Sequence, residues 1–474
     1  MYTDDTIVAP ATIAGTGAIS LLRISGPDAF RVADAVVELT SGKISESEGY
    51  TLHFGHVFST PGQLLDDVVV SVFRAPHSYT GEDSVEISCH ASSYIVSELL
   101  RLFTEHGART AYPGEFTQRA FINGKMDLAQ AEAVADVISS TTKASHRVAV
   151  NQLRGGVSKE LSALRARLLD MCSLLELELD FSDEEVTFAP REQLLEMIGE
   201  CADKIDSLRR SFKLGNAIKR GVPVAIVGPP NAGKSSLLNL LLGDDRAIVS
   251  PVAGTTRDTV EETMVIGGVL FRFIDTAGIR ESSEEVESLG IERTFRKISE
   301  AEIVISVLDA ASDQTDLLHN LESVADHLDK ETQNLLILVN KSDNVGKEGV
   351  NKNVSIINNY VLSAGLKAKT IEFSAKTGFG LNQLRDELVA ICAPILSSED
   401  STFITNARHY EALTEASEHL SVAATSLRSG TIPSDLIAED LRLVITDLGT
   451  ITGQSLITPD EILGTIFRNF CIGK

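Results

Sequence analysis

Residues 224–242 read VAIVGPPNAGKSSLLNLLL, and this stretch decides the fold. An apolar run of strand length, 224–227, leads into the pattern G-x-x-x-x-G-K-[ST], and a helical stretch, 236–242, follows. This order predicts a phosphate-binding loop, because glycines let backbone N–H groups wrap phosphates at the N-terminus of a helix. Lys234 is expected to reach the outer phosphates, and the Ser235 hydroxyl to bind Mg²⁺.

Three companion motifs follow further apolar runs: D-x-x-G at 275–278, N-K-x-D at 340–343 and S-A-K at 374–376. Ligands of parallel sheets lie at the carboxyl ends of the strands, which is where these motifs stand. Asp275 is expected to hold Mg²⁺ through water, and the Gly278 N–H to sense the terminal phosphate. The predicted GTP contacts are Asn231, Ala232, Gly233, Lys234, Ser235, Ser236, Ser250, Thr255, Thr256, Asp275, Thr276, Ala277, Gly278, Asn340, Lys341, Asp343, Ser374, Ala375 and Lys376.

The N-K-x-D motif predicts guanine as the base. A carboxylate at Asp343 can accept hydrogen bonds from both the ring N–H and the exocyclic amine of guanine, and adenine offers neither there. A carboxylate left unpaired by the wrong base is expensive, so a discrimination of about 10⁴ is plausible. The chain is therefore expected to bind and hydrolyse GTP.

The motifs identify the catalytic residues less directly than they identify the GTP contacts. Ras-like proteins place a water-orienting Gln directly after D-x-x-G, and this chain has Ile279, which can neither donate nor accept a hydrogen bond. Arg257 and Arg280 are the nearest arginine-finger candidates, or they are surface arginines. In the intervening loop, 250–258, Thr256 is well placed to complete the Mg²⁺ shell. Carbonyls of this loop and the Asn231 side chain could bind K⁺ as a fixed charge at the phosphates, or Asn231 caps the loop.

The amino-acid composition limits the class of protein and the cellular location that we expect. The chain has 474 residues, 43% of them hydrophobic and 23% charged, an ordinary globular composition with room for about three domains. It has five cysteines without a C-x-x-C pair, an acidic N-terminus and no long apolar run. We therefore expect a cytoplasmic protein without a membrane span. The net charge of −25 argues against non-specific coating of nucleic acid.

The pattern of apolar residues and turn signals along the chain predicts a multidomain α+β and α/β protein. Residues 1–120 mix short alternating strands and turns, residues 121–217 have helical periodicity, and residues 218–383 alternate strands with helices in a mostly parallel sheet. Helical texture returns in 384–474. The two helical segments are expected to form one discontinuous all-α domain that carries the Ras-like P-loop domain as an insertion. Two independent helical domains are the alternative.

The whole set of motifs resembles the bacterial tRNA modification GTPases of the MnmE (TrmE) family. The nucleotide motifs are shared by many GTPases, but the two ends of the chain are specific. They are Asp5–Ala9, Leu22–Gly26, Tyr79–Asp83, Pro113–Phe116, Arg119–Glu132 and the terminal Phe470-Cys471-Ile472-Gly473-Lys474. The resemblance covers essentially the whole chain.

The resemblance implies the substrate and the partners. Together with an FAD-containing, MnmG/GidA-like partner, the family adds a carboxymethylaminomethyl-type group to the wobble uridine of certain tRNAs. The one-carbon unit comes from a tetrahydrofolate derivative, 5-formyl- or 5,10-methylene-tetrahydrofolate, held by an N-terminal folate-binding-like domain. Arg23, Glu82, Lys125 and Lys474 correspond to the folate contacts. From the residues alone, Arg23 and Glu82 are expected to form an ion pair.

For the nucleotide domain the resemblance implies K⁺ dependence, with Asn231, Ser250, Val252 and Thr255 as ligands and Ser235 and Thr256 on Mg²⁺. Glu287 corresponds to the residue that orients the attacking water. With Asp275 and Lys234 it makes up the expected catalytic set. It also implies a homodimer through the N-terminal domain and a heterotetramer with the partner. Cys471 is either a catalytic thiol or a small apolar residue at the folate pocket.

Two other functions stay open on the residues. One is a regulatory GTPase switch that acts on ribosomes or their assembly, since many GTPases without the Gln work in that way. The other is a folate-dependent one-carbon transferase that uses GTP only for assembly. A folate pocket in the N-terminal 120 residues would support tRNA modification, and a plain interaction domain there would support the ribosome switch. Modification of tRNA by a variant that cannot hydrolyse GTP would favour the transferase.

Overall fold

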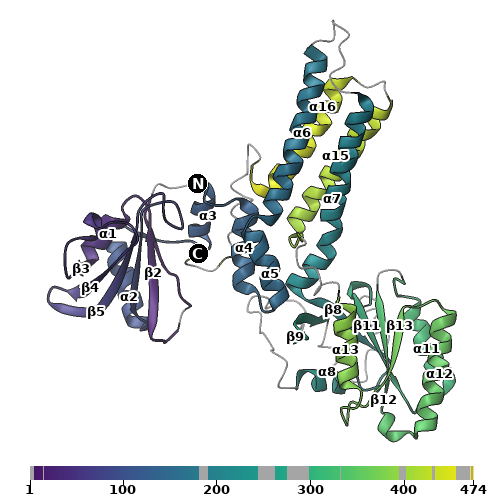
Figure 1. The fold of residues 1–474 in the computed structure, drawn as a ribbon. Helices are drawn as coiled ribbons and strands as arrows, with labels where there is room; N and C mark the ends of the chain where they lie inside the picture. Colours follow the sequence, from purple (N-terminus) through teal and green to yellow (C-terminus); the bar gives the residue numbers. More distant parts are fainter. Residues whose placement is uncertain are drawn as a thin grey trace. The chain divides into compact units, whose positions relative to one another are not determined.

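The computed structural model describes residues 5–13, 15–180, 190–243, 262–274, 298–330, 333–393, 402–429, 433–454, 470 and 473. The chain divides into two compact units. The first comprises Met1–Ile138, Val150–Asp206 and Glu411–Lys474, and the second comprises Ser139–Ala149 and Ser207–Tyr410. Figure 1 shows the elements of both units along the chain. The domain limits expected from the sequence stay a prediction.

The N-terminal part of the first unit is a seven-stranded sheet in the order β3-β4-β5-β6-β2-β1-β7. All neighbouring pairs are antiparallel except β1 with β7, which is parallel. The strands are β1 (Ile7–Pro10), β2 (Ile19–Ser25), β3 (Val37–Leu39), β4 (Thr51–Thr60), β5 (Gln63–Phe73), β6 (Ser84–His90) and β7 (Arg109–Thr110). The expected α+β character of this region is confirmed.

Two helices supply the apolar cover of this sheet, α1 (Ala29–Val36) and α2 (Ser93–Glu105). Their buried residues Phe30, Leu99 and Phe103 belong to one core with alternate residues of the strands, such as Val70 and Ile87. The alternation is the period of two that places one face of each strand on a core. A third helix, α3 (Glu115–Ile122), carries the buried Arg119 described below.

The rest of the first unit is helical. Its elements are α4 (Leu128–Ser139), part of α5 (Lys143–Leu153), α6 (Gly156–Asp180), part of α7 (Arg191–Arg220), most of α15 (Ala407–Ser429) and α16 (Ser434–Thr452). Helices α6 and α16 pack along each other. The helices expected over 126–138, 157–179, 411–427 and 434–450 are confirmed as α4, α6, α15 and α16. The helix expected over 459–470 lies outside the described residues, apart from Phe470.

The second unit contains a six-stranded sheet in the order β13-β12-β11-β8-β10-β9. Neighbouring strands are parallel except β9 with β10, so the expected mostly parallel sheet is confirmed. The strands are β8 (Val222–Val227), β9 (Glu262–Ile266), β10 (Val269–Phe273), β11 (Ile303–Asp309), β12 (Asn334–Asn340) and β13 (Ala368–Glu372). The sequence reading missed β9, an edge strand of five residues that the Gly267-Gly268 turn joins to β10.

Both faces of this sheet are buried. Val224 and Ile226 of β8 belong to one core with α8 (Lys234–Leu242) and α13 (Leu381–Ile391). Ala225 and Val227 belong to a second core with α11 (Gln314–Ala325) and α12 (Lys347–Ser363). A strand buried on both sides reads as a continuous apolar run, and this explains why β8 was easy to recognise.

Candidate nucleotide site and N-terminal charge network

The phosphate loop connects the carboxyl end of β8 to the first turn of α8. Its glycines are required by the backbone: Gly228 has φ 143° and Gly233 has φ 104°, conformations that side chains disfavour. A Cβ at Gly228 would also collide with the Val307 carbonyl oxygen. Lys234 Nζ donates to the carbonyl oxygens of Gly228 (2.9 Å) and Pro229 (2.8 Å), so its ammonium group lies against the loop.

Asn340 ties the phosphate loop to the base-binding loops. Asn340 is the last residue of β12 and is 2% exposed. Its side-chain amide nitrogen donates to the Ala232 carbonyl at 2.7 Å. Its amide oxygen accepts from the Ala375 N–H at 2.9 Å. The sequence placed Asn340 among the GTP contacts, and the structure shows that it joins three loops by hydrogen bonds.

The Asp343 carboxylate is held in place from the loop that follows β13. Ser374 Oγ, 1% exposed, donates to its Oδ1 at 2.7 Å, and the exposed Lys376 ammonium lies 3.9 Å from its Oδ2. Ser342 N–H also donates to the Phe373 carbonyl at 3.1 Å, which closes the two loops on each other. A carboxylate held in a fixed position can accept from the ring N–H and the exocyclic amine of guanine together.

Lys341 shows a contact that the sequence reading missed. Its backbone is left-handed, with φ 62°, and its Nζ pairs with Asp309 Oδ2 at 2.6 Å. Asp309 is the last residue of β11, so it stands at the same sheet edge as the other loops. An acidic residue directly after an apolar strand was the signal that could have identified it.

Other predicted residues are only partly described. Ser235 and Ser236 lie exposed in the first turn of α8, and Asn231 is exposed with φ 57°. Within the described part of the chain the Asn231 side chain has no hydrogen-bond partner, so nothing there supports a loop cap. Outside the described residues lie Arg257, Ile279 and Arg280, and with them Ser250, Val252, Thr255, Thr256, Asp275, Thr276, Ala277, Gly278 and Glu287.

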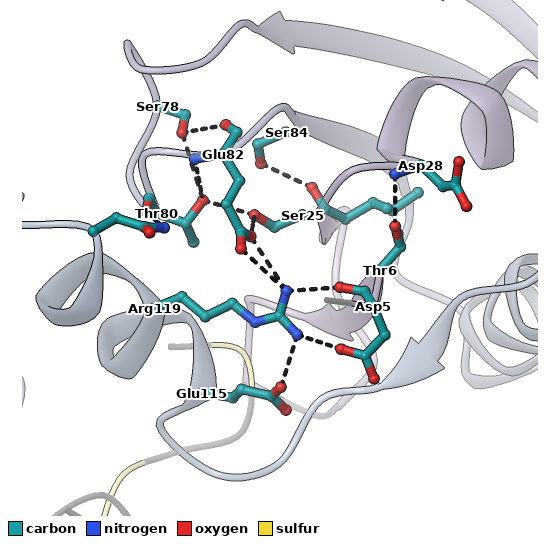
Figure 2. Close-up of polar contacts among 12 residues, drawn as sticks. Asp5, Thr6, Ser25, Asp28, Ser78, Thr80, Glu82, Ser84, Glu115 and Arg119 are labelled. Carbon is teal, nitrogen blue, oxygen red and sulfur yellow. Dashed lines mark hydrogen bonds and ion pairs between the residues drawn. The ribbon is translucent and has the colours of Figure 1, made fainter. Parts of the chain in front are cut away.

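The N-terminal unit holds a buried charge network around Arg119, shown in Figure 2. The Arg119 side chain is 3% exposed and donates to Asp5 Oδ1 at 2.7 Å and Glu115 Oε1 at 3.0 Å. It also lies 3.3 Å from both Glu82 oxygens. Arg109 pairs with the same Asp5 and Glu115. The sequence reading quoted Arg119 without giving it a role, because its partners are scattered along the chain.

The predicted Arg23–Glu82 ion pair is wrong. Arg23 on β2 pairs with Glu86, its cross-strand neighbour on β6, at 2.7 Å, because their Cα atoms are in register. Its guanidinium also lies 5.0 Å from the Tyr79 ring centroid. Glu82 instead accepts from Ser25 Oγ at 2.8 Å and faces Arg119.

The other folate candidates are placed in part. Lys125 is exposed, and its Nζ donates to the Pro76 carbonyl at 2.9 Å. Cys471 and Lys474 lie outside the described residues, but Gly473 between them packs on Pro10 at the end of β1. The four described cysteines, Cys89, Cys172, Cys201 and Cys392, are buried, and burial raises the pKa of each thiol.

A phosphate loop, an N-K-x-D loop and an S-A-K loop at one edge of a mostly parallel sheet define a P-loop GTPase. Two family models together match nearly the whole chain, "GTP-binding protein TrmE N-terminus" over residues 6–125 and "MnmE helical domain" over 128–471. The chain belongs to the MnmE family of tRNA modification GTPases.

Full-length relatives agree with this assignment. A Flavobacterium johnsoniae protein named tRNA modification GTPase MnmE is 46% identical over 100% of both chains. Proteins of the same name from Bacteroides fragilis and Bacteroides thetaiotaomicron are 47% and 46% identical, each over 99% of both chains. No helix in the described part of the chain is long and apolar enough to cross a membrane.

Proposed function

We propose that this chain is the GTP-hydrolysing subunit of a tRNA-modifying enzyme. With an FAD-containing, MnmG/GidA-like partner, it places a carboxymethylaminomethyl-type group on the wobble uridine of tRNA, using a tetrahydrofolate one-carbon unit. The observation that carries the proposal is one chain that holds a complete set of guanine-nucleotide loops and matches, end to end, relatives named tRNA modification GTPase. Those relatives also favour modification over a ribosome-directed switch.

The nucleotide loops suit GTP and two cations. Asp343, held by Ser374, would accept from guanine, and Lys234 would stabilise the phosphates. The exposed Ser235 hydroxyl would bind Mg²⁺ with Thr256 and, through water, Asp275. Mg²⁺ would supply charge neutralisation at the phosphates. Glu287 would orient the attacking water, a task that Ile279 cannot perform.

A potassium ion fits the same loop. The Asn231 side chain is exposed and has no hydrogen-bond partner in the described residues, so its amide oxygen is available as a ligand. The remaining ligands would be Ser250, Val252 and Thr255. This cation would provide the fixed positive charge that an arginine finger supplies in other GTPases.

Tetrahydrofolate fits the N-terminal domain by its chemistry. Glu82 has carboxylate oxygens, which are acceptors of the kind that the N–H donors of a pterin require. The half-buried Tyr79 ring, whose centroid lies 5.0 Å from the Arg23 guanidinium, offers a flat apolar surface beside it. The exposed cation of Lys125, and Lys474 at the chain end, would pair with the glutamate carboxylates. The packing of Gly473 on Pro10 supports a terminus at this domain.

Apolar residues on the N-terminal sheet support a homodimer. Leu52 and Phe54 of β4 are 72% and 47% exposed, and Val69, opposite Phe54 on β5, is 41% exposed. Side chains at alternate positions of neighbouring strands share one face, so these three form a continuous apolar patch. A second copy of this chain would cover it, and two FAD-containing subunits would complete a heterotetramer.

Steady-state GTP hydrolysis by the purified chain in KCl and NaCl at equal ionic strength tests the nucleotide part. We expect a large gain in KCl that Asn231→Ala abolishes. A matched Asn320→Ala control, on a partly exposed position of α11, should keep the gain. Equal rates in both salts would refute the K⁺ assignment and leave the GTPase assignment intact.

The modification part needs a separate measurement. A tRNA transcript is incubated with the chain, the FAD-containing partner, GTP and methylene-tetrahydrofolate, and position 34 is analysed by mass spectrometry. An added mass that requires all components supports the proposal. Modification that persists with Asp275→Ala, which hydrolyses no GTP, would instead favour a transferase that uses GTP for assembly only.

A further inference from the structure

The ion pair between Lys341 and Asp309 joins two neighbouring strand ends of the nucleotide sheet. Lys341 follows Asn340 in the N-K-x-D loop, and Asp309 is the last residue of β11. The Lys341 side chain is 34% exposed, the Asp309 side chain is 23% exposed, and Nζ lies 2.6 Å from Oδ2. A pair at this distance is a charge-assisted hydrogen bond between two partly shielded groups.

The backbone of Lys341 has an unfavourable conformation. In the described part of the chain, three residues other than glycine have a positive φ, namely Tyr50, Asn231 and Lys341. Two of these three lie in the nucleotide loops. A left-handed backbone disfavours a β-carbon, and such positions gather where function requires a particular side-chain direction. We therefore expect the direction of the Lys341 side chain to have a function.

The Asp309 carboxylate is itself held in a fixed position. Its Oδ1 accepts from the Ala311 N–H at 2.9 Å, while its Oδ2 receives the Lys341 ammonium. The Asp309 backbone is in register with Asn340 of β12, and the Ala310 N–H extends this pairing by donating to the Asn340 carbonyl at 2.8 Å. The acceptor therefore belongs to the rigid sheet edge, and it determines where the lysine ammonium lies.

Two side chains of the N-K-x-D loop are tied to opposite neighbours of β12. The strand order at this place is β13-β12-β11-β8. Asp343 is held by Ser374, from the loop that follows β13, whereas Lys341 is held by Asp309, at the end of β11. The phosphate loop follows β8, on the far side of β11. Along this sheet edge, the Lys341 side chain therefore lies between the base-binding carboxylate and the phosphate loop.

A nucleotide bound by both loops has to cross this position. Adjacent strands lie about 4.8 Å apart, so β12 and β8 are separated by about 10 Å. A guanine on Asp343 with its phosphates at the phosphate loop therefore spans the end of β11, where Lys341 meets Asp309. The stem of a lysine is a flexible apolar chain that packs along apolar surface while its charged tip is solvated or paired. A stem that is anchored at its tip offers a flat apolar support to one face of the purine.

We propose that Asp309 is a positioning residue for the bound nucleotide: it anchors the Lys341 ammonium so that the lysine stem covers one face of the guanine ring. A lysine side chain without this anchor has large rotamer freedom, which binding would have to remove. The inference rests on the proposed guanine site at Asp343 and adds a second determinant of nucleotide affinity. Asp343 recognises the edge of the base, whereas the anchored stem supports its face.

The test measures binding of GDP and of inosine diphosphate to the full-length protein, by displacement of a ribose-labelled fluorescent GDP in the presence of Mg²⁺. Hypoxanthine lacks the exocyclic amine of guanine, so the ratio of the two affinities reports on recognition of the edge. The variant is Asp309→Ala. The matched control is Glu387→Ala on α13, whose 18% exposed carboxylate pairs with Lys369 near the start of β13, away from the loops.

We expect Asp309→Ala to weaken the binding of both nucleotides by the same factor, about five- to tenfold, because the stem contacts a part of the base that both share. The ratio of the two affinities should stay that of the parent, and Glu387→Ala should bind both nucleotides as the parent does. Unchanged GDP binding by Asp309→Ala would overturn the inference, and so would a changed ratio.

A double-mutant cycle shows whether Asp309 acts through Lys341. Lys341→Met keeps an unbranched apolar stem and removes the ammonium, so that Asp309 has nothing to anchor. Asp309→Ala should then cause no further loss of GDP affinity in the Lys341→Met protein. An equal loss in both backgrounds would mean that Asp309 only supports the fold, and the inference would be wrong. The comparison holds even if Asp309→Ala lowers the unfolding midpoint, because that effect is present in both backgrounds.

Asp343→Asn separates this inference from the proposed guanine site. If Asp343→Asn leaves GDP affinity unchanged, the guanine site itself is wrong, and the role of Asp309 is refuted with it. If Asp343→Asn weakens GDP binding while Asp309→Ala binds GDP as the parent does, only the positioning role is refuted and the guanine site stands.

Discussion

The nucleotide loops of the second unit and the Arg119 network of the first hold polar groups in different ways. In the loops, hydrogen bonds of the uncharged side chains Asn340 and Ser374 fix the backbone and one carboxylate at a sheet edge. In the network, the Arg119 guanidinium is surrounded by the carboxylates of Asp5, Glu82 and Glu115. The loops present groups to a ligand, whereas the network mainly satisfies its own charges. Substitutions in the loops should therefore lower the affinity for the nucleotide, whereas substitutions in the network should lower the stability of the folded domain.

The largest effect is expected at the base-binding carboxylate. Asp343→Asn replaces an acceptor of two hydrogen bonds by a group that offers one acceptor and one donor, so it mismatches guanine. We expect GDP binding to weaken about 10³- to 10⁴-fold, measured by titration of a fluorescent analogue. Thermal stability should change little, because Asp343 lies at the surface end of the loop. A variant that keeps GDP affinity within tenfold would contradict the assigned role.

The charge network should show the opposite result. Arg119→Ala leaves three carboxylates near one another with their shared cation removed, and we expect a loss of about 3–5 kcal/mol of unfolding free energy. Urea denaturation followed by circular dichroism measures it. The control is Arg101→Ala, whose pairs with Glu98 and Glu105 are exposed and worth at most about 1 kcal/mol. Similar losses for both variants would remove the distinction between the two regions.

The hub of the nucleotide loops lies between these cases. Asn340→Ala removes one buried and one partly buried hydrogen bond, so both GDP affinity and stability should fall, each by about 2–3 kcal/mol. Calorimetric titration and thermal unfolding measure the two quantities. Asn353→Ala, which removes a single partly buried bond to Ala310, is the control and should leave GDP affinity unchanged. An Asn340→Ala variant with parental affinity would show that the loops keep their places without the hub.

The smallest effect concerns pH. Burial raises the pKa of the Glu115 carboxyl, but hydrogen bonds from Arg109, the Tyr112 N–H and Arg119 outweigh it and lower the pKa overall. A folded pKa below the unfolded value of about 4.3 means that this stabilisation is present at neutral pH and is lost as the pH falls below about 4. Glu115→Gln should therefore flatten the loss of stability between pH 5 and about 3 in urea denaturation. An unchanged profile would show that Glu115 does not contribute to it.

The sequence predicted the two regions to different extents. The loops follow apolar strands in short, ordered motifs, so the spacing alone located Lys234, Asn340 and Asp343. The network joins Asp5 to Arg119 through space, and no period or spacing connects them. The Arg23–Glu82 prediction failed for the same reason, because strand register, not sequence proximity of motifs, gave Arg23 its partner Glu86. Edge strand β9 was missed since its short run, Glu262–Ile266, is only partly apolar.

The backbone conformation of Gly233 and its contact with Asn340 limit which substitutions both positions can accept during evolution. Its φ of 104° disfavours any side chain, and a Cβ there would also collide with the Asn340 amide. A second mutation that shortened Asn340 would relieve the collision but not the backbone strain, and it would break the bond to Ala232. A substitution at either position is therefore expected to be harmful whether or not the other residue has changed. We expect glycine at 233 and asparagine at 340 to be retained together in functional relatives.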